Sequence, residues 1–144
     1  YHNIMLSVRS IEEALYYWNH GIRNVMFCVE ISSRADFEAY DASPIPWRYI
    51  MAYIRLAVNP ELQQVYDLLH AEGVMTMTSI TGSSDKVKNP HDRRVAYMRE
   101  LLAEPDIIET DYPSEFNGLP WSRDAIHALQ DAAIRGNRTT TDLK

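Results

Sequence analysis

The sequence is short of cationic residues, cysteine and long apolar runs, and each shortage excludes a class of protein. Its 14 Lys and Arg stand against 20 Asp and Glu, and the formal net charge of −6 argues against a nucleic-acid backbone as partner. The single cysteine, Cys28, excludes a disulfide within the chain. No apolar run approaches the roughly 18 residues of a membrane-spanning helix, and no signal peptide is visible. With 5 glycines and 7 prolines, the sequence is also unlike those of fibrous or disordered chains.

The composition that remains is that of an ordinary globular chain. With 46% hydrophobic and 24% charged residues in a length of 144, the sequence predicts a single domain, 1–144, that is large enough for a core. Residues 137–144 are expected to form a frayed tail. An apolar strand begins within a few residues of Tyr1, which is not a methionine. We therefore expect Tyr1 to be an internal cut, made by processing, by proteolysis or by the choice of the expressed fragment.

Short apolar runs alternate with amphipathic stretches along the chain. The runs predict strands at 3–7, 25–29, 48–55, 74–79 and 107–109. The amphipathic stretches predict helices at 10–20, 33–40, 59–72 and 91–103, followed by a last helix that begins at Ser122. Strands that alternate with helices at this spacing predict an α/β fold made of parallel βα units.

Two architectures fit this pattern. About five βα units are too few for a closed barrel of eight strands and about 250 residues, so the chain is either part of a TIM-type barrel or an open, doubly wound parallel sheet. The pattern alone does not separate the two. Local signals support the helices: Ser10 and Glu13 form a capping box, and Val95, Met98 and Leu102 form the expected buried stripe of the helix at 91–103.

Three segments carry a resemblance to a known family. Met5-Leu6-Ser7-Val8, the stretch 73–82 and the stretch 106–113 resemble, in this order and spacing, the fourth, seventh and eighth strands of the glycerophosphodiester phosphodiesterases. The last stretch ends in Thr110-Asp111-Tyr112-Pro113, which is similar to the family's Thr-Asp-x-Pro. The family belongs to the phosphatidylinositol-phospholipase-C-like TIM-barrel superfamily. The resemblance therefore implies that this chain is the C-terminal portion, strands four to eight, of a (β/α)8 barrel.

The resemblance also implies a chemistry. Members of the family cleave phosphodiesters by metal-assisted attack, with one histidine as base and another as acid. The His-Arg pair, the second histidine and the acidic ligands of a divalent cation, Mg²⁺ or Ca²⁺, lie on strands that precede the matched ones. This sequence has no His-Arg dipeptide, and the nearest stretch, His91-Asp92-Arg93, lies after the strand at 74–79. No catalytic residue and no metal ligand is carried over, and we expect this chain alone to bind no cation.

The sequence departs from the family pattern at one strand end. Where members often have Trp-Thr-Val-Asn, this chain has Ser79-Ile80-Thr81-Gly82. Because the aromatic wall of the glycerol-side pocket is missing, the sequence does not predict which alcohol group the substrate carries. The polar loop 81–86 lacks the Lys-Ser continuation of a P-loop, and we interpret it as a mobile lid rather than a phosphate cradle.

Functional side chains of a parallel barrel lie at the carboxyl ends of its strands. That rule selects five candidates for the substrate pocket: Arg9, Glu30, Arg55, Ser79 and Asp111. The Arg9 guanidinium could fork onto a phosphate, although a surface arginine beside a helix start fits the sequence equally well. Glu30 could bind a cation or a hydroxyl, but a solvated strand end is favoured. Asp111 could orient a ligand, but a cap for the turn before Pro113 is favoured.

Two functions follow. The first is the C-terminal segment of a metal-dependent glycerophosphodiester phosphodiesterase-like hydrolase, which acts on a small-molecule phosphodiester only together with the N-terminal barrel strands. The second is a non-catalytic βα domain, or binding module, that associates with itself. In both, the two open strand edges of a partial barrel must be covered, by an N-terminal barrel segment or by self-association.

Overall fold

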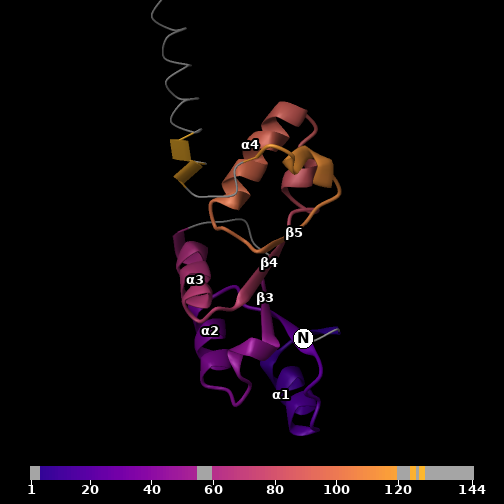
Figure 1. Cartoon of the computed structure of the whole chain (residues 1–144), viewed down its shortest axis with the longest axis vertical. Coiled ribbons are helices and arrows are strands. Elements are labelled where there is room, and N and C mark those ends of the chain that lie inside the picture. Colours follow the sequence, from indigo (N-terminus) through magenta and orange to yellow (C-terminus); the bar gives the residue numbers. More distant parts are fainter. Residues whose placement is uncertain (1–3, 55–59, 120–123, 126, 129–144) are drawn as a thin grey trace, which may run out of the picture.

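The computed structural model of this protein describes residues 4–54, 60–119, 124–125 and 127–128. These residues form a sheet of five parallel strands in the order β1-β2-β3-β4-β5 (Figure 1). The strands are β1 (Met5–Val8), β2 (Met26–Glu30), β3 (Ile50–Ile54), β4 (Met75–Ser79) and β5 (Ile107–Glu109). The α-helices are α1 (Ile11–Asn19), α2 (Arg34–Asp41), α3 (Pro60–Ala71) and α4 (Pro90–Leu101). The 3-10 helices are η1 (Trp47–Tyr49), η2 (Ser84–Lys86) and η3 (Pro113–Phe116).

The strands and the first four helices lie where the sequence predicts them, mostly within one or two residues. The stretch 48–55 is an exception, because η1 follows Pro46 and the strand begins only at Ile50. The last predicted helix begins at Ser122, which lies outside the described residues, as does the expected tail 137–144. No helix in the described part of the chain is long and apolar enough to cross a membrane.

Side chains cap the helices and fix where they begin. The Ser10 hydroxyl accepts a hydrogen bond from the Glu13 backbone N–H at 3.3 Å, as the predicted capping box requires. The Glu13 carboxylate, however, accepts from the N–H of Arg9 at 2.7 Å instead of that of Ser10. At α4, Asn89 caps the first turn, with Pro90 as the first helical residue. Residue 59, where the sequence predicts that the helix at 59–72 begins, lies outside the described residues.

The strand order decides between the two predicted architectures. Each strand pairs in parallel with the next strand along the chain, so successive right-handed crossovers place their helices on one face of the sheet. Side chains of α1, α2 and α3 accordingly meet in one core against the same face of β1, β2 and β3. A doubly wound sheet reverses its strand order and carries helices on both faces. The prediction of a partial TIM-type barrel is therefore confirmed, and the doubly wound alternative is wrong.

The face of the sheet that the helices cover forms the core. Phe27 and Val29 of β2, Ala52 and Ile54 of β3 are fully buried there, and Tyr66 of α3 packs against the same cluster. Because successive side chains of a strand point to opposite faces, the residues between them belong to the other, inner face. Along each strand, every second side chain therefore packs in the helix-covered core, and the side chains between them lie on the inner face.

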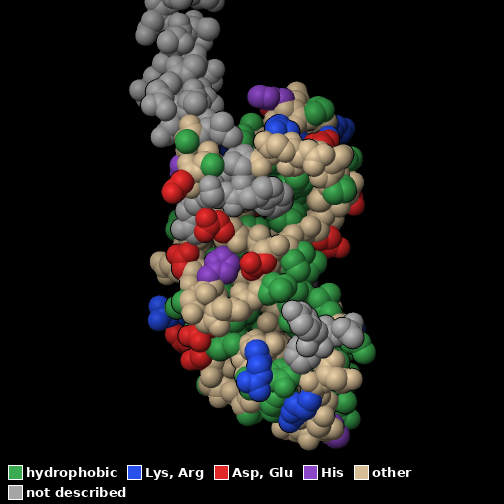
Figure 2. All heavy atoms as spheres, in the orientation of Figure 1, with side chains coloured by type: hydrophobic (Ala, Val, Ile, Leu, Met, Phe, Trp, Pro, Cys, Tyr) green, Lys and Arg blue, Asp and Glu red, His purple; other side chains and the backbone are tan. Residues whose placement is uncertain are grey.

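The inner face of the sheet is only partly covered. Met5 of β1, Met75 of β4 and Ile107 of β5 point away from the helices and remain 52%, 42% and 38% exposed. Figure 2 shows hydrophobic side chains that reach the surface at mid-height of the view, over the strands. In a closed barrel these positions pack against the side chains of the remaining strands. The described residues therefore present the interior of an open barrel to solvent.

The buried face of α4 differs from the prediction. The expected stripe of Val95, Met98 and Leu102 is only half-buried, and the fully buried positions are Arg93, Tyr97, Glu100 and Leu101. The helix is rotated because its polar side chains have partners in η2 and η3. An apolar stripe cannot reveal such a rotation, since it assumes that buried positions are apolar.

Arg93 joins α4 to the segment that follows β5. Its guanidinium donates two hydrogen bonds to the Glu115 carboxylate and one, at 2.9 Å, to the carbonyl of Val87. It also lies 4.3 Å from the centre of the Tyr112 ring. The hydrogen bond from Arg93 lowers the pKa of the Glu115 carboxyl below its ordinary value of 4.5. Arg93 thus has a structural role, and the stretch His91-Asp92-Arg93 is not a counterpart of the family's catalytic His-Arg pair.

The two faces of the sheet should respond differently to truncation. We expect Phe27→Ala to lower the free energy of unfolding by about 3–5 kcal/mol, because it opens a cavity in the covered core. The control Met75→Ala should cost less than about 1 kcal/mol, because that side chain already contacts solvent. Urea denaturation followed by circular dichroism measures both. Equal losses would contradict an uncovered inner face.

The Arg93–Glu115 pair should stabilise the chain only while the carboxylate is charged. A lowered pKa means that this stabilisation is complete above the ordinary value of 4.5 and is lost as the pH falls through the folded value. Glu115→Gln should therefore be less stable than the wild type near about pH 7, and the difference should shrink towards about pH 3. Urea denaturation across this range tests it. Glu38→Gln, which removes an exposed pair within α2, is the control and should change little. A loss of unfolding free energy in Glu115→Gln that stays the same at every pH would contradict this prediction.

Candidate functional site

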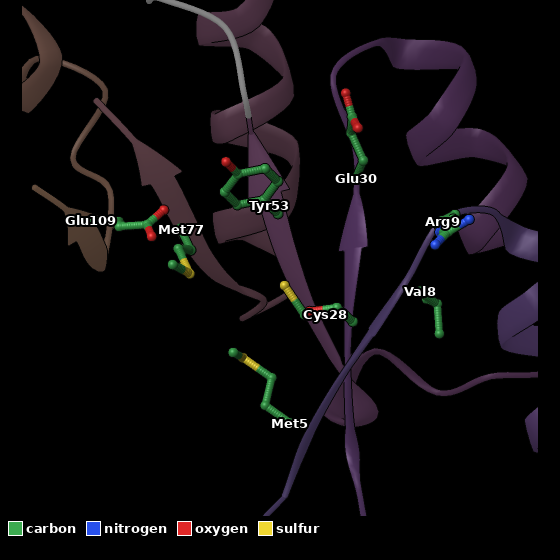
Figure 3. A pocket seen from close by; sticks show the side chains of 9 residues that line it. Met5, Val8, Arg9, Cys28, Glu30, Tyr53, Met77 and Glu109 are labelled. Carbon is green, nitrogen blue, oxygen red and sulfur yellow. The ribbon is translucent and has the colours of Figure 1, made fainter. Parts of the chain in front are cut away.

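A hollow of about 800 Å³ lies on the inner face of the sheet (Figure 3). Its lining comes from all five strands and the residue after β1: Met5, Ser7, Val8, Arg9, Cys28, Glu30, Tyr53, Met77 and Glu109. Figure 3 shows Arg9, Glu30, Tyr53 and Glu109 near the carboxyl ends of the strands, and Met5 and Cys28 farther down. The hollow thus has an apolar floor and a polar mouth.

The parallel register brings the polar side chains of the mouth together. Glu30, the last residue of β2, pairs directly with Tyr53 of β3, and Tyr53 pairs in turn with Met77 of β4. Ser79, the last residue of β4, pairs with Glu109, the last residue of β5. Because parallel strands all point the same way, residues far apart in sequence meet at one edge. The mouth therefore combines a guanidinium, two carboxylates and a phenol.

The floor of the hollow offers no activated nucleophile. Cys28 is 7% exposed, and burial raises the pKa of its thiol above the ordinary value of 9.0. A thiol with a raised pKa stays protonated at neutral pH and reacts slowly. Cys28 is thus a buried residue, one side of which also lines the hollow.

The structure brings two of the five predicted site residues together. Arg9 and Glu30 both line the hollow, and they also share a smaller hollow of about 350 Å³ beside the start of α1. Ser79 does not line either hollow, and its hydroxyl lies 3.2 Å from that of Thr81. Asp111 lies beyond the mouth, and its backbone N–H donates a hydrogen bond to the Asp85 carboxylate. Arg55 lies outside the described residues.

Sequence reasoning missed two polar residues of the mouth, Tyr53 and Glu109. Glu109 had a visible signal, because Glu109-Thr110-Asp111 is a pair of carboxylates at a strand end, and only Asp111 was selected. Tyr53 lies two residues before the predicted candidate Arg55, within the strand. Its place in the mouth depends on the pairing with Glu30, which the sequence does not specify.

A second group of polar side chains lies beside the mouth, around Asp85 of η2. The carboxylate is 4% exposed and accepts hydrogen bonds from the Tyr97 hydroxyl at 2.6 Å, the Thr110 hydroxyl at 2.9 Å and the Asp111 N–H at 2.6 Å. Burial and the hydrogen bond to this carboxylate raise the pKa of Tyr97 to about 12. Tyr97 therefore stays a hydrogen-bond donor at any physiological pH. Thr110 also accepts from the Tyr112 N–H at 3.1 Å, which is the local turn expected before Pro113.

The described residues do not fit a divalent-cation site. Residues 4–54, 60–119, 124–125 and 127–128 hold no group of three or more His, Cys, Asp or Glu side chains that could bind a metal. Glu30 and Glu109 supply two carboxylates to the mouth, so the remaining oxygen ligands of a cation such as Mg²⁺ would have to come from water, substrate or other strands. No chemical step through a metal can be assigned to these side chains.

Comparison with solved structures supports the partial-barrel fold. The chain is similar to the crystal structure of a glycerophosphoryl diester phosphodiesterase from Parabacteroides distasonis, with 34% sequence identity and a TM-score of 0.71. The similarity covers 87% of this chain and 41% of that one, in its C-terminal part. No protein-family model and no curated protein matches the chain. The resemblance found in the sequence is therefore confirmed: this chain is similar to a glycerophosphoryl diester phosphodiesterase, over the C-terminal part of that protein.

Proposed function

We propose that this chain supplies the C-terminal five βα units of a glycerophosphodiester phosphodiesterase-like hydrolase. The observation that carries the proposal is the polar mouth of the inner-face hollow, in a chain similar to a glycerophosphoryl diester phosphodiesterase. Active sites of TIM-type barrels lie at this carboxyl edge. In this proposal the histidines that act as acid and base, and the ligands of a divalent cation, belong to barrel strands beyond the chain described here.

Arg9 is the residue proposed to bind the phosphate. It follows β1 directly, its backbone N–H is fixed by the Glu13 carboxylate, and the residue lines the hollow near the carboxyl ends of the strands (Figure 3). A planar guanidinium can donate two parallel hydrogen bonds to phosphate oxygens. Its positive charge would also stabilise the charge that develops on the oxygens during displacement.

The rest of the mouth is suited to the alcohol part of a small phosphodiester. The carboxylates of Glu30 and Glu109 would repel a phosphate but accept hydrogen bonds from hydroxyl or ammonium groups. The Tyr53 ring adds an apolar wall with a polar tip. With serine rather than an aromatic residue at position 79, that wall comes from a different strand than in the family pattern.

A second candidate function is a non-catalytic βα domain that associates with itself. It is favoured by the exposure of Met5, Met75 and Ile107 on the inner face, and by the edges of β1 and β5, which pair on one side only in the described part of the chain. Exposed apolar surface and open edges promote association. In the first proposal the same surfaces are covered by an N-terminal barrel segment.

One comparison separates the two proposals. The intact mass of the full gene product is compared with that of this chain, and both are assayed for hydrolysis of glycerophosphodiesters with Mg²⁺ or Ca²⁺. Light scattering of this chain alone then gives its oligomeric state. Activity in a longer product and none in this chain supports the severed barrel. A gene product that begins at Tyr1, forms a dimer and hydrolyses nothing supports the self-associating domain.

Replacing Arg9 should impair catalysis by the longer product. We expect Arg9→Ala to lower kcat/KM by about 100-fold or more, because the charge on the phosphate loses its guanidinium, and Arg9→Lys to recover only part of it. Arg34→Ala is the matched control, since Arg34 lies on α2 in an exposed pair with Glu38. Steady-state kinetics on a glycerophosphodiester measures all three. Equal kcat/KM in Arg9→Ala and Arg34→Ala would exclude Arg9 from phosphate binding.

Removal of metal should abolish hydrolysis by the longer product and leave the melting temperature of this chain unchanged. We expect chelation by EDTA to abolish hydrolysis and Mg²⁺ or Ca²⁺ to restore it, because the proposed chemistry depends on a cation. The melting temperature of this chain alone should not move on addition of either ion, since a ligand stabilises only the state that binds it. Activity that survives chelation would contradict the metal-dependent part of the proposal.

A further inference from the structure

We infer that Asp85 is a positioning residue: its buried carboxylate holds the end of β5, and with it Glu109, in place at the mouth. The inference rests on the proposed function and adds to it a residue that does not touch the hollow. Asp85 lies in η2, in the loop after β4, and the hydrogen bonds it accepts come from α4 and from the chain that leaves β5.

The carboxylate joins three segments that are otherwise far apart in sequence. Oδ1 accepts from the hydroxyls of Tyr97 and Thr110, and Oδ2 accepts from the backbone N–H of Asp111 at 2.6 Å. A hydrogen bond to a charged acceptor is stronger than one between neutral groups, and burial strengthens it further. The chain that leaves β5 is therefore fixed at two successive residues, Thr110 and Asp111.

Backbone hydrogen bonds extend this hold to Glu109. The N–H of Ile80 donates to the carbonyl of Glu109 at 3.0 Å, and the N–H of Asp85 donates to the carbonyl of Ile80 at 3.1 Å. Together with the bond from Asp111 to Asp85, they close a ring between the ends of β4 and β5. Glu109 lies on this ring and lines the hollow. A shift of the Asp85 loop therefore moves a side chain of the mouth.

The chemistry of the partners favours a carboxylate over an amide. Tyr97, Thr110 and the Asp111 backbone all donate to Asp85, so both side-chain oxygens must accept. An asparagine of the same shape could accept through one oxygen only, and its NH₂ would face hydroxyls that must then accept, although the Thr110 hydroxyl already accepts from the Tyr112 N–H. The loop 81–86, interpreted from the sequence as a lid, thus contains an anchor between two strand ends.

Asp106 provides a control at the opposite end of the same two strands. Its carboxylate accepts from the Thr76 N–H at 2.7 Å and from the Thr76 hydroxyl at 2.9 Å, and so joins the starts of β4 and β5. It is more exposed than Asp85 and lies away from the mouth. Loss of its bonds should affect stability, whereas loss of the Asp85 bonds should also affect substrate binding.

The test compares Asp85→Asn with Asp106→Asn in the longer product, by urea denaturation and by steady-state kinetics on a glycerophosphodiester. For Asp85→Asn we expect KM to rise about tenfold with little change in kcat, because a misplaced mouth weakens binding of substrate and transition state alike. For Asp106→Asn we expect lower stability with an unchanged KM. Thr110→Val removes one hydroxyl from the same group without removing the carboxylate, and it should raise KM by a smaller factor.

The outcomes separate the inference from the function on which it rests. A wild-type product that hydrolyses no phosphodiester overturns the proposed function, and this inference with it. An active wild type with the same KM in Asp85→Asn and in Asp106→Asn overturns the inference alone. If Asp85→Asn does not fold, Thr110→Val decides, and a KM equal to that of the wild type again overturns the inference.

Discussion

In the part of the chain that the structure describes, everything depends on a parallel sheet that has helices on one face only. Sequential pairing of β1 to β5 places α1, α2 and α3 against Phe27, Val29 and their neighbours, and leaves the opposite face with exposed Met5, Met75 and Ile107. In a barrel, that opposite face is the interior, which other strands must fill. The same constraint explains why the hollow exists at all, because it is the part of the interior that the described strands enclose only in part.

Parallel strands also explain why function concentrates at one edge. The polar residues of the mouth lie at the last or next-to-last position of their strands or directly follow them, whereas the floor is made by residues nearer the strand starts (Figure 3). The two ends of β4 and β5 are held by different carboxylates, Asp85 at the carboxyl edge and Asp106 at the amino edge. At the carboxyl edge, a hydrogen-bond network fixes the chain beside a candidate site. At the amino edge, a similar network has only the sheet to support.

The comparison that shows the similarity to a phosphodiesterase also shows that the chain matches only part of that protein. The chain spans 41% of the protein that it resembles, and its described residues hold no group of three or more His, Cys, Asp or Glu side chains that could bind a metal. What these residues offer is a set of groups suited to binding: a guanidinium, two carboxylates and a phenol around a hollow. Under the proposed function, substrate recognition and chemistry belong to different parts of one barrel.

The sequence by itself determined the order of strands and helices, the Ser10 cap of α1 and the resemblance to the family, because these depend on local periodicity and short motifs. It also selected Arg9 and Glu30, since a strand end can be found from the apolar run before it. Only the tertiary structure decided which strands pair, and therefore that Tyr53 and Glu109 share a mouth with those two residues. The rotation of α4 and the burial of Asp85 were likewise decided by tertiary contacts. Polar partners from distant segments made burial of those side chains favourable, and no local pattern of apolar residues records such partners.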